Sequence, residues 1–414
     1  MDIAKYSIGT GDRFGLQGKA QLAAVLKARD QGAELAIVWN KSHREHTIVK
    51  TIPKDVRVEA DQAVSECGWT GQYFVDADHI GLGNVDLFLE SSDFFTLDVA
   101  DFIGEKADDE SLAEFRRKYS QLVGELTIPG IEQPLSVTAD LLESVAEKYL
   151  FAVQEAGKIY RHIANMRGSG NFITEVSMDE TAEPQTPVDL LFVLAAIADE
   201  NIPAQTIAPK FSGRFNKSVD YIGDVEQFRR EFEEDICIIK YGVKAFGLAE
   251  NMKLSVHSGS DKFSIYKPIR ELTRKHDAGI HLKTAGTTWL EELIGLAEAG
   301  GEGLRIAKQI YVSSYNRFEE LCTPYSSVID IDREALPEPA EVEEWTGERY
   351  VKALRHDQTC PNFDVNLRQL LHVGYKVAAE MGDTYLNAIR ENEEVVAKNV
   401  TENLFDRHIA PLFL

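Results

Sequence analysis

Cysteine is scarce in this sequence, and none of its cysteines form a CxxC pair. The 414 residues include only four, Cys67, Cys237, Cys322 and Cys360, which lie far apart. This pattern argues against a thiolate metal site and favours a reducing compartment. The N-terminal segment MDIAKYSIGTGDRFG has no apolar core, and no stretch approaches the length of a membrane span. We therefore expect a cytoplasmic protein with no membrane partner.

Positive charge is also in short supply. The chain has 44 Lys and Arg residues against 68 Asp and Glu residues, which gives a formal net charge of −24. Such a surface repels nucleic acid and anionic lipid, so neither is an expected partner. A small anionic ligand would need positive charge gathered locally at its site. Solubility alone explains the acidity equally well.

Short apolar runs alternate with helical patterns over the first 300 residues. Alternating strands and helices predict parallel strands, because each crossover needs the length of a helix. Eight such units predict an α/β fold, a (β/α)₈ TIM-type barrel over residues 1–300. The predicted strands are 6–10, 34–40, 73–78, 94–100, 171–177, 204–209, 253–258 and 279–286.

Two segments do not follow this repeat. Residues 104–170 read as a helical insertion after the fourth strand, on the side of the barrel where active sites are usually elaborated. Residues 301–414 read as a mostly helical C-terminal extension packed on the barrel, because FDVNLRQLLHVGYKVAAEM has apolar residues at helical spacing. Apolar helices in this extension allow a homo-oligomer.

Ionisable residues gather where the predicted strands end. In a parallel barrel, inward-pointing residues at the carboxyl ends of the strands carry the chemistry. The third strand ends in YFVDADHI, an apolar run followed by two acids and a histidine, and four later strands end in a similar way. The residues concerned are Asp76, Asp78, His79, Glu175, Asp179, Lys210, His257, His281 and Lys283.

Three histidines at three strand ends, with carboxylates near two of them, predict a metal site. A single histidine at a strand end is more often a hydrogen-bonded core or rim residue. The set of His79, His257 and His281 is harder to explain in that way. Imidazole and carboxylate ligands suit Zn²⁺, Mn²⁺, Ni²⁺, Co²⁺ or Fe²⁺, and three protein ligands leave positions for substrate oxygens. We therefore predict a catalytic divalent transition metal on these histidines.

The other histidines are given structural interpretations. We predict that five of them, which lie among charged residues, are solvated. The five are His43, His46, His276, His356 and His408. His162 and His372 fall within helical patterns; His372 could reach a site if the tail folds back, but we expect it to pack in the core. The glycines of GTGDRFG have GxGxxxG spacing without a helix opening at the third glycine, so no nucleotide cofactor is expected.

Three lysines at the predicted site suggest an anionic ligand. Lys210, Lys262 and Lys283 in an acidic protein would suit a small anion such as a sugar acid. Ion pairs of these lysines with Asp179 and Asp261 are an equally good explanation. We assign the three lysines and Asp179 to substrate binding.

The segments GTGDRFG, VWNKSHREHTI, YFVDADHI, EVSMDET and VDYIGD resemble the tagaturonate/fructuronate epimerase family, and the resemblance runs from residue 5 to the C-terminus. It implies a metal-dependent epimerase with a barrel fold, acting on ketohexuronates in bacterial galacturonate and glucuronate catabolism. Members of the family have also been linked to neutral ketohexoses such as fructose and tagatose.

The chemistry of this conversion limits its mechanism. Tagaturonate and fructuronate differ at a carbinol carbon β to the ketone, which enolisation alone does not invert. Retro-aldol cleavage and re-closure inverts it, and direct proton exchange is the harder alternative. We assign the two proton-transfer roles to Asp78 and Glu175, with Asp179 in reserve for Glu175. A metal-dependent class II aldolase and a non-enzymatic sugar-acid-binding protein remain alternatives.

Overall fold

Eight parallel strands close into a barrel in this computed structural model, which describes residues 1–179, 181 and 183–414. Each strand falls on one of the predicted apolar runs, so the (β/α)₈ barrel prediction is confirmed. Residue 180 of the EVSMDET segment lies outside the described residues. Around the barrel the strands are β1 (Tyr6–Thr10), β2 (Ala36–Ser42), β3 (Tyr73–Ile80), β4 (Phe94–Asp98), β7 (Ile173–Ser177), β8 (Thr206–Ala208), β9 (Lys253–His257) and β10 (Ile280–Lys283).

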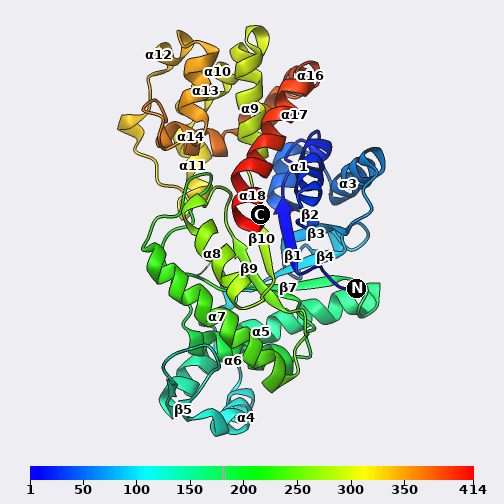
Figure 1. The fold of residues 1–414 in the computed structure, drawn as a ribbon, viewed down its shortest axis with the longest axis vertical. Helices are drawn as coiled ribbons and strands as arrows, with labels where there is room; N and C mark the ends of the chain where they lie inside the picture. Colours follow the sequence, from blue (N-terminus) through cyan, green and yellow to red (C-terminus); the bar gives the residue numbers. More distant parts are fainter. Residues whose placement is uncertain (180, 182) are drawn as a thin grey trace.

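Helices cover the outside of the barrel (Figure 1). Local sequence sets their starts: Thr186 and Asp189 form a capping box around the first turn of α6, and Pro187 occupies its first position. The covering helices are α1 (Gly18–Asp30), α3 (Pro53–Cys67), α5 (Ala139–Arg167), α6 (Pro187–Asp199), α7 (Val225–Phe246) and α8 (Phe263–Lys275).

The last residues of the chain complete the barrel wall. A π-helix at Asn403–Ile409 and α18 (Ala410–Phe413) pack against α1 and α8, on either side of the point where β10 meets β1 (Figure 1). Leu404, Ile409 and Leu412 belong to the same hydrophobic core as the barrel strands. The C-terminal segment therefore occupies the position that the helix after the eighth strand, β10, would take in a regular (β/α)₈ barrel.

The extension has a second hydrophobic core of its own. Its helices share this core with α9 (Thr288–Ala299), the helix that follows β10. The cores thus divide the chain before α9 and again near residue 403, rather than at the predicted boundary of 300. The extension helices are α10 (Gly301–Asn316), α11 (Phe318–Cys322), α12 (Pro339–Glu343), α13 (Gly347–Leu354), α14 (Val365–Val373), α15 (Tyr375–Met381), α16 (Asp383–Glu391) and α17 (Glu393–Glu402).

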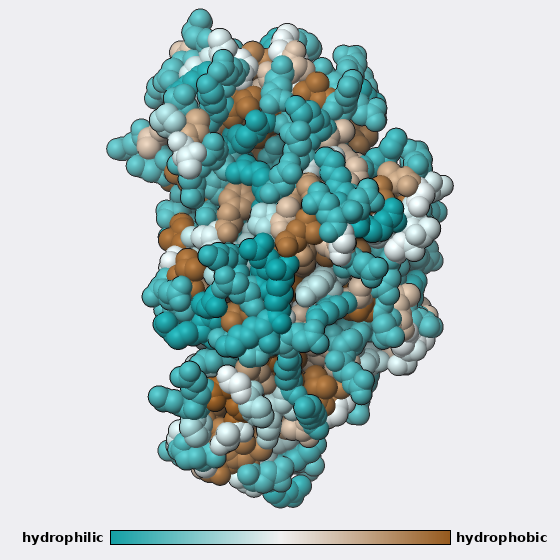
Figure 2. All heavy atoms as spheres, viewed as in Figure 1, coloured by the Kyte–Doolittle hydropathy of each residue, from teal (hydrophilic) through white to brown (hydrophobic). Residues whose placement is uncertain are grey.

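The segment 104–170 lies at the other end of the molecule from the extension (Figure 1). It contains α4 (Asp109–Tyr119), the antiparallel pair β5 (Gly124–Leu126) and β6 (Leu135–Val137), and α5. Because α5 packs against β4 and α6, it is also part of the barrel wall. None of the helices described is long and apolar enough to cross a membrane. The face drawn in Figure 2 is mostly hydrophilic, with small scattered apolar patches.

Candidate metal and substrate site

A cavity of about 750 Å³ lies at the carboxyl ends of the barrel strands. Its walls come from the loops after β1, β2, β3, β7, β8, β9 and β10, and from Tyr325, Val328 and His372 of the extension. This volume suits a small-molecule ligand. No described residue of 104–170 lines it, so the insertion does not elaborate this site as the sequence led us to expect.

The nine predicted site residues divide into two layers. Asp78, His79, Asp179, Lys210 and His257 line the cavity. The other four are absent from its lining and lie deeper in the protein; they are Glu175, Lys262, His281 and Lys283. The first group can touch a ligand directly, whereas the second group can act only through its neighbours.

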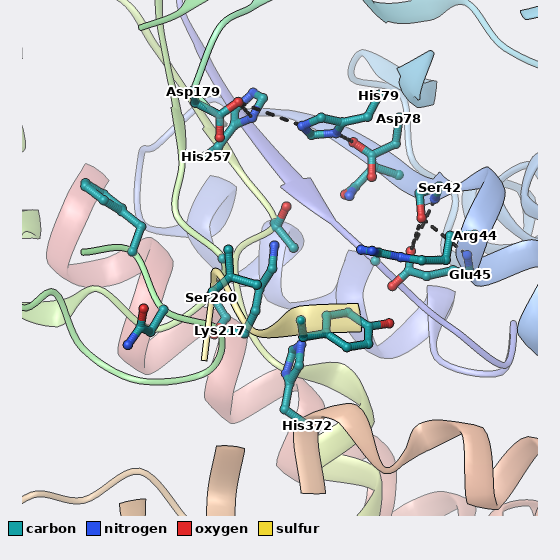
Figure 3. A pocket seen from close by; sticks show the side chains of 18 of the residues that line it. Ser42, Arg44, Glu45, Asp78, His79, Asp179, Lys217, His257, Ser260 and His372 are labelled. Carbon is teal, nitrogen blue, oxygen red and sulfur yellow. Dashed lines mark hydrogen bonds and ion pairs between the residues drawn. The ribbon is translucent and has the colours of Figure 1, made fainter. Parts of the chain in front are cut away.

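His79, Asp179 and His257 form a group that could hold a metal ion, with one ligand atom from each within 4.8 Å of the others. Asp179 Oδ1 is 2.9 Å from His257 Nδ1 and 3.8 Å from His79 Nε2 (Figure 3). Both ring nitrogens are buried, and the Asp179 carboxylate is the group that each of them faces among the described residues. Two imidazole nitrogens that converge on one carboxylate oxygen fit the ligand set of a divalent transition metal.

The other ring nitrogen of each histidine contacts a second carboxylate. His79 Nδ1 lies 2.7 Å from Asp78 Oδ1, and His257 Nε2 lies 2.8 Å from Glu175 Oε1. Metal-ligating histidines usually have such a partner, because it fixes the ring and its tautomer. Asp78 and Glu175 are therefore placed to orient the two rings toward Asp179.

A kink at the end of β3 explains how Asp78 and His79 serve the same site. Adjacent residues of a regular strand point to opposite faces. Here the pairing of β3 with β4 shifts register between Ala77 and Ile80, and His79 has φ of 53°, which is uncommon outside glycine. The turn of the backbone at His79 brings its ring to the side of the Asp78 carboxylate.

Lys283 lies beneath the metal group as the centre of a buried ion-pair cluster. Its Nζ is 2.7 Å from Asp76, 3.0 Å from Asp78 and 3.3 Å from Glu175. Burial opposes the charge of Lys283, but the three carboxylates raise its pKa above the usual value. Burial in turn raises the pKa of Asp76 to about 6. The ammonium group of Lys283, which the sequence suggested for substrate binding, is thus already paired with three carboxylates.

His281 occupies a deeper layer of the barrel than the metal group. In the β9–β10 register Lys283 pairs with His257, whereas His281 pairs with Ser255, two residues nearer the bottom. Its Nδ1 lies 2.9 Å from Ser7 Oγ, and burial lowers its pKa to about 3. His281 does not belong to the described group of potential ligands. Asp179, assigned to substrate binding, is found in that group instead.

The loop after β9 is fixed by two buried charges that point away from the cavity. Lys262 Nζ donates to the carbonyls of Asn216 and Val219 at 2.9 and 2.6 Å, so it does not reach a ligand. Asp261 is 2.7 Å from Arg368. Between the cavity and these anchors, Gly259 and Ser260 form part of the wall.

Three histidines predicted to be solvated are in fact buried. His356 and His408 lie 2.9 and 3.1 Å from Asp261, and His46 lies 2.8 Å from Thr51 Oγ1. The prediction was wrong because charged neighbours in the sequence do not by themselves place a side chain at the surface. His372 packs in its helix as expected but also lines the cavity.

Sequence reasoning missed several cavity residues. They are Asn40, Arg13, Arg44 and Lys217. The GTGDRFG segment holds part of this signal: the Asp12 carboxylate accepts hydrogen bonds from the backbone N–H groups of Phe14, Gly15 and Leu16, which shapes the loop that carries Arg13. Charged residues in loops far apart in the chain gave no sign that they share one cavity.

Comparison with known proteins confirms the family resemblance. The tagaturonate epimerase family model matches residues 1–412. The chain is 28% identical, over an alignment of 421 residues, to a tagaturonate/fructuronate epimerase of Thermotoga maritima, covering 97% of this chain and 80% of the relative. A glycerol-complexed crystal structure of the fructuronate-tagaturonate epimerase from Cohnella laeviribosi matches with a TM-score of 0.80 and 25% identity, covering 98% of this chain and 81% of that one. The native structure of that enzyme matches over the same shares of the two chains with a TM-score of 0.77 and 25% identity. The chain belongs to the tagaturonate epimerase family, a family of isomerases.

Proposed function

We propose that the protein is a metal-dependent epimerase that interconverts D-tagaturonate and D-fructuronate. The observation that supports the metal is the convergence of two buried nitrogens, one from His79 and one from His257, on the Asp179 carboxylate. These three residues would hold one divalent ion, with Zn²⁺, Mn²⁺, Ni²⁺, Co²⁺ and Fe²⁺ as candidates. When bound, the ion would polarise the ketone and an adjacent hydroxyl of the substrate. The choice of substrate rests on the names of the relatives, which are tagaturonate/fructuronate epimerases. The scarcity of cysteine supports a cytoplasmic location.

Asp78 is the carboxylate best placed to take the proton of the substrate hydroxyl. Its Oδ1 faces both His79 and Lys283, while the residue lines the cavity and has its second oxygen available. Although burial opposes it, the charge of Lys283 lowers the pKa of Asp78 well below its usual value, so the group is ionised at neutral pH. Asp78 thus keeps the catalytic role that the sequence suggested.

Glu175 is better placed to orient than to react. It is fully buried, absent from the cavity lining, and in contact with His257 through Oε1. To exchange a proton with the substrate, as predicted, Glu175 would have to act through the His257 ring. Of the other predicted site residues on the cavity wall, Lys210 makes no ion pair with a described residue, so its side chain can approach the re-forming hydroxyl. We therefore assign Glu175 to positioning and Lys210 to the second proton transfer.

The retro-aldol step balances with these groups. The hydroxyl proton passes to Asp78, the carbonyl of an aldehyde forms, and the electron pair of the broken carbon–carbon bond moves onto the carbon beside the ketone. The aldehyde then rotates, the bond re-forms on its other face, and the new alkoxide takes a proton from Lys210. A return of protons between Asp78 and Lys210 through solvent resets the site.

Product analysis tests the function. Protein stripped with a chelator is refilled with each candidate ion and incubated with D-tagaturonate, and the products are identified by NMR. Fructuronate is expected only in refilled samples. No fructuronate with any ion would refute the proposal, and a free aldehyde accumulating in its place would favour an aldolase. Binding of sugar acid that survives metal removal, with no turnover, would favour a binding protein.

Solvent deuterium tests the mechanism. Retro-aldol cleavage leaves the hydrogen on the inverted carbon in place, whereas proton exchange replaces it from water. The product formed in deuterium oxide is expected to contain no deuterium at that carbon. Deuterium there would contradict the retro-aldol route while leaving the epimerase activity intact.

A further inference from the structure

Three of the cations that line the cavity have no acidic partner among the described residues. Among those that line it, Arg13 is 3.2 Å from Glu45 and Arg214 is 2.9 Å from Asp330. Arg44, Lys210 and Lys217 make no ion pair with any described residue, although the protein carries a net charge of −24. In so acidic a chain, three unpaired cations in one cavity point to an anionic ligand. Lys210 is already assigned to proton transfer, which leaves Arg44 and Lys217 for binding the anion.

Arg44 and Lys217 reach the cavity from different walls. Arg44 belongs to α2 (His43–Val49), which follows β2, and Lys217 lies in the loop between β8 and α7. Figure 3 shows the Arg44 side chain extending toward that of Lys217, with both residues set apart from His257 and Asp179. The cavity therefore has a metal end, formed by His79, Asp179 and His257, and a cationic end, formed by Arg44 and Lys217.

The extension holds the cationic end in place. The Arg44 guanidinium lies 4.6 Å from the ring centroid of Tyr325, and the Tyr325 hydroxyl lies 2.9 Å from that of Tyr375. The Lys217 backbone N–H donates to the Val328 carbonyl at 2.8 Å. Both cations are thus positioned by residues that come from outside the barrel.

The field at this end is positive. His372 lines the same cavity, and its Nε2 is 3.3 Å from Arg13. Burial and the neighbouring charges of Arg13 and Lys217 lower the pKa of His372 well below its usual value, so the ring is neutral.

We infer that Arg44 and Lys217 bind the carboxylate of the substrate and so select uronates over neutral ketohexoses. The inference rests on the proposed function. An open-chain ketohexuronate has its ketone near one end and its carboxylate at the other, which matches a cavity with a metal end and a cationic end. A guanidinium can bind a carboxylate with two parallel hydrogen bonds, and an ammonium adds a point charge. The hydroxymethyl group of a neutral ketohexose offers no charge to either.

The test compares two substrates in three variants and one control variant. Arg44→Gln and Lys217→Gln are each expected to raise the KM for D-tagaturonate about 10- to 100-fold, as for the loss of a hydrogen bond to a charged group, with kcat changed less than about threefold. In both variants the preference for D-tagaturonate over D-tagatose is expected to fall by the same factor, and Lys217→Arg is expected to restore most of the affinity that Lys217→Gln loses. Arg305→Gln, an exposed charge on α10 that pairs with Glu302, is the control for the change in net charge.

A binding measurement separates this inference from the proposed function. Titration calorimetry on the chelator-treated full-length chain compares D-gluconate with its uncharged counterpart D-glucitol. The wild type and Arg305→Gln are expected to bind gluconate more tightly than glucitol, and Arg44→Gln and Lys217→Gln are expected to lose that preference. This result would stand even if no tagaturonate were turned over. No preference for gluconate in the wild type, or an unchanged preference and KM in both variants, would overturn the inference.

Discussion

The two ends of the cavity are built in different ways. The metal end uses side chains from the carboxyl ends of barrel strands, and each ring is held by a buried carboxylate. The cationic end uses Arg44, which is exposed, and Lys217, which is half-buried, and both depend on contacts from the extension. The comparison teaches that barrel loops can supply both the chemistry and the substrate-binding cations while a separate helical unit holds those cations in place.

The largest expected effect is a loss of activity that distinguishes the role of Asp78 from that of Glu175, the two carboxylates that contact the histidine rings. Asp78→Asn is expected to lower kcat about 100- to 1,000-fold even at saturating metal, because the proton acceptor is lost. Glu175→Gln is expected to weaken metal binding about 10- to 100-fold through the loss of an orienting partner, with most of the activity returning at excess metal. Metal titrations that follow kcat check both.

One outcome would reverse this division of roles. If Glu175→Gln binds metal normally but stays inactive at saturation, Glu175 takes part directly in proton transfer, as the sequence first suggested. Recovery of Asp78→Asn at excess metal would likewise reduce Asp78 to an orienting group.

The next effect concerns the anchor between the barrel and the extension. Asp261→Asn leaves Arg368 buried without a full counter-charge, and it is expected to destabilise the fold by about 3–5 kcal/mol. The matched control Asp330→Asn breaks the exposed pair with Arg214 and is expected to cost less than about 1 kcal/mol. Calorimetric Tm values give both.

The same variant sharpens the comparison of the two ends. Because Asp261 ties the extension to the loop after β9, its loss is expected to raise the KM for D-tagaturonate while the metal content of the folded protein stays normal. A normal KM with a lowered metal content would show that the anchor serves the metal end instead.

A pH-dependent effect is expected at Glu291, on the helix that leads from barrel to extension. Burial raises its pKa to about 7 from 4.5 in the unfolded chain. Between these values the folded protein holds a proton that the unfolded chain has released, so this group makes stability fall as pH rises through that window, by about 3 kcal/mol in total. Glu291→Gln removes the titration while it can keep the hydrogen bond from Asn403, 3.0 Å long.

The difference in Tm between Glu291→Gln and the wild type measures this effect. It is expected to be near zero at pH 5 and positive by a few degrees at pH 8. An equal difference at both pH values would mean that Glu291 does not titrate in this window.

The smallest expected effect lies at the support of the cationic end. Tyr325→Phe keeps the ring beneath Arg44 but removes the hydroxyl that lies 2.9 Å from Tyr375. The loss of one neutral hydrogen bond, about 1 kcal/mol, predicts a two- to fivefold rise in the KM for D-tagaturonate with kcat unchanged. A rise as large as that of Arg44→Gln would mean that the hydroxyl itself touches the substrate.

The fold could be predicted because each barrel strand is a local signal. Runs such as YSIGT and ELAIVW are apolar, short and separated by helical patterns, so the number and order of the strands could be predicted from the sequence. The division of the two hydrophobic cores was not, because it depends on residues 403–413 returning to pack against α1 and α8. Contact between distant segments leaves no periodic trace in the sequence.

The site could be predicted in part for the same reason. Strand-end reasoning found His79, Asp179 and His257, but it fixes a position along the chain and not a depth in the barrel. His281 and Lys283 share a face of β10, yet His281 lies one layer lower, beside Ser7. Arg44 and Lys217 could not be found, since only the folded extension shows that their loops meet at one cavity.

Metal content tests the central claim most directly. Each variant is loaded with Mn²⁺ or Zn²⁺, desalted, checked for folding by circular dichroism, and analysed by plasma mass spectrometry. The wild type and His162→Ala, which alters a surface histidine that pairs with Asp86, are predicted to retain one ion per chain. His79→Ala, Asp179→Asn and His257→Ala are predicted to retain almost none. A full complement of metal in these three folded variants would contradict the assignment.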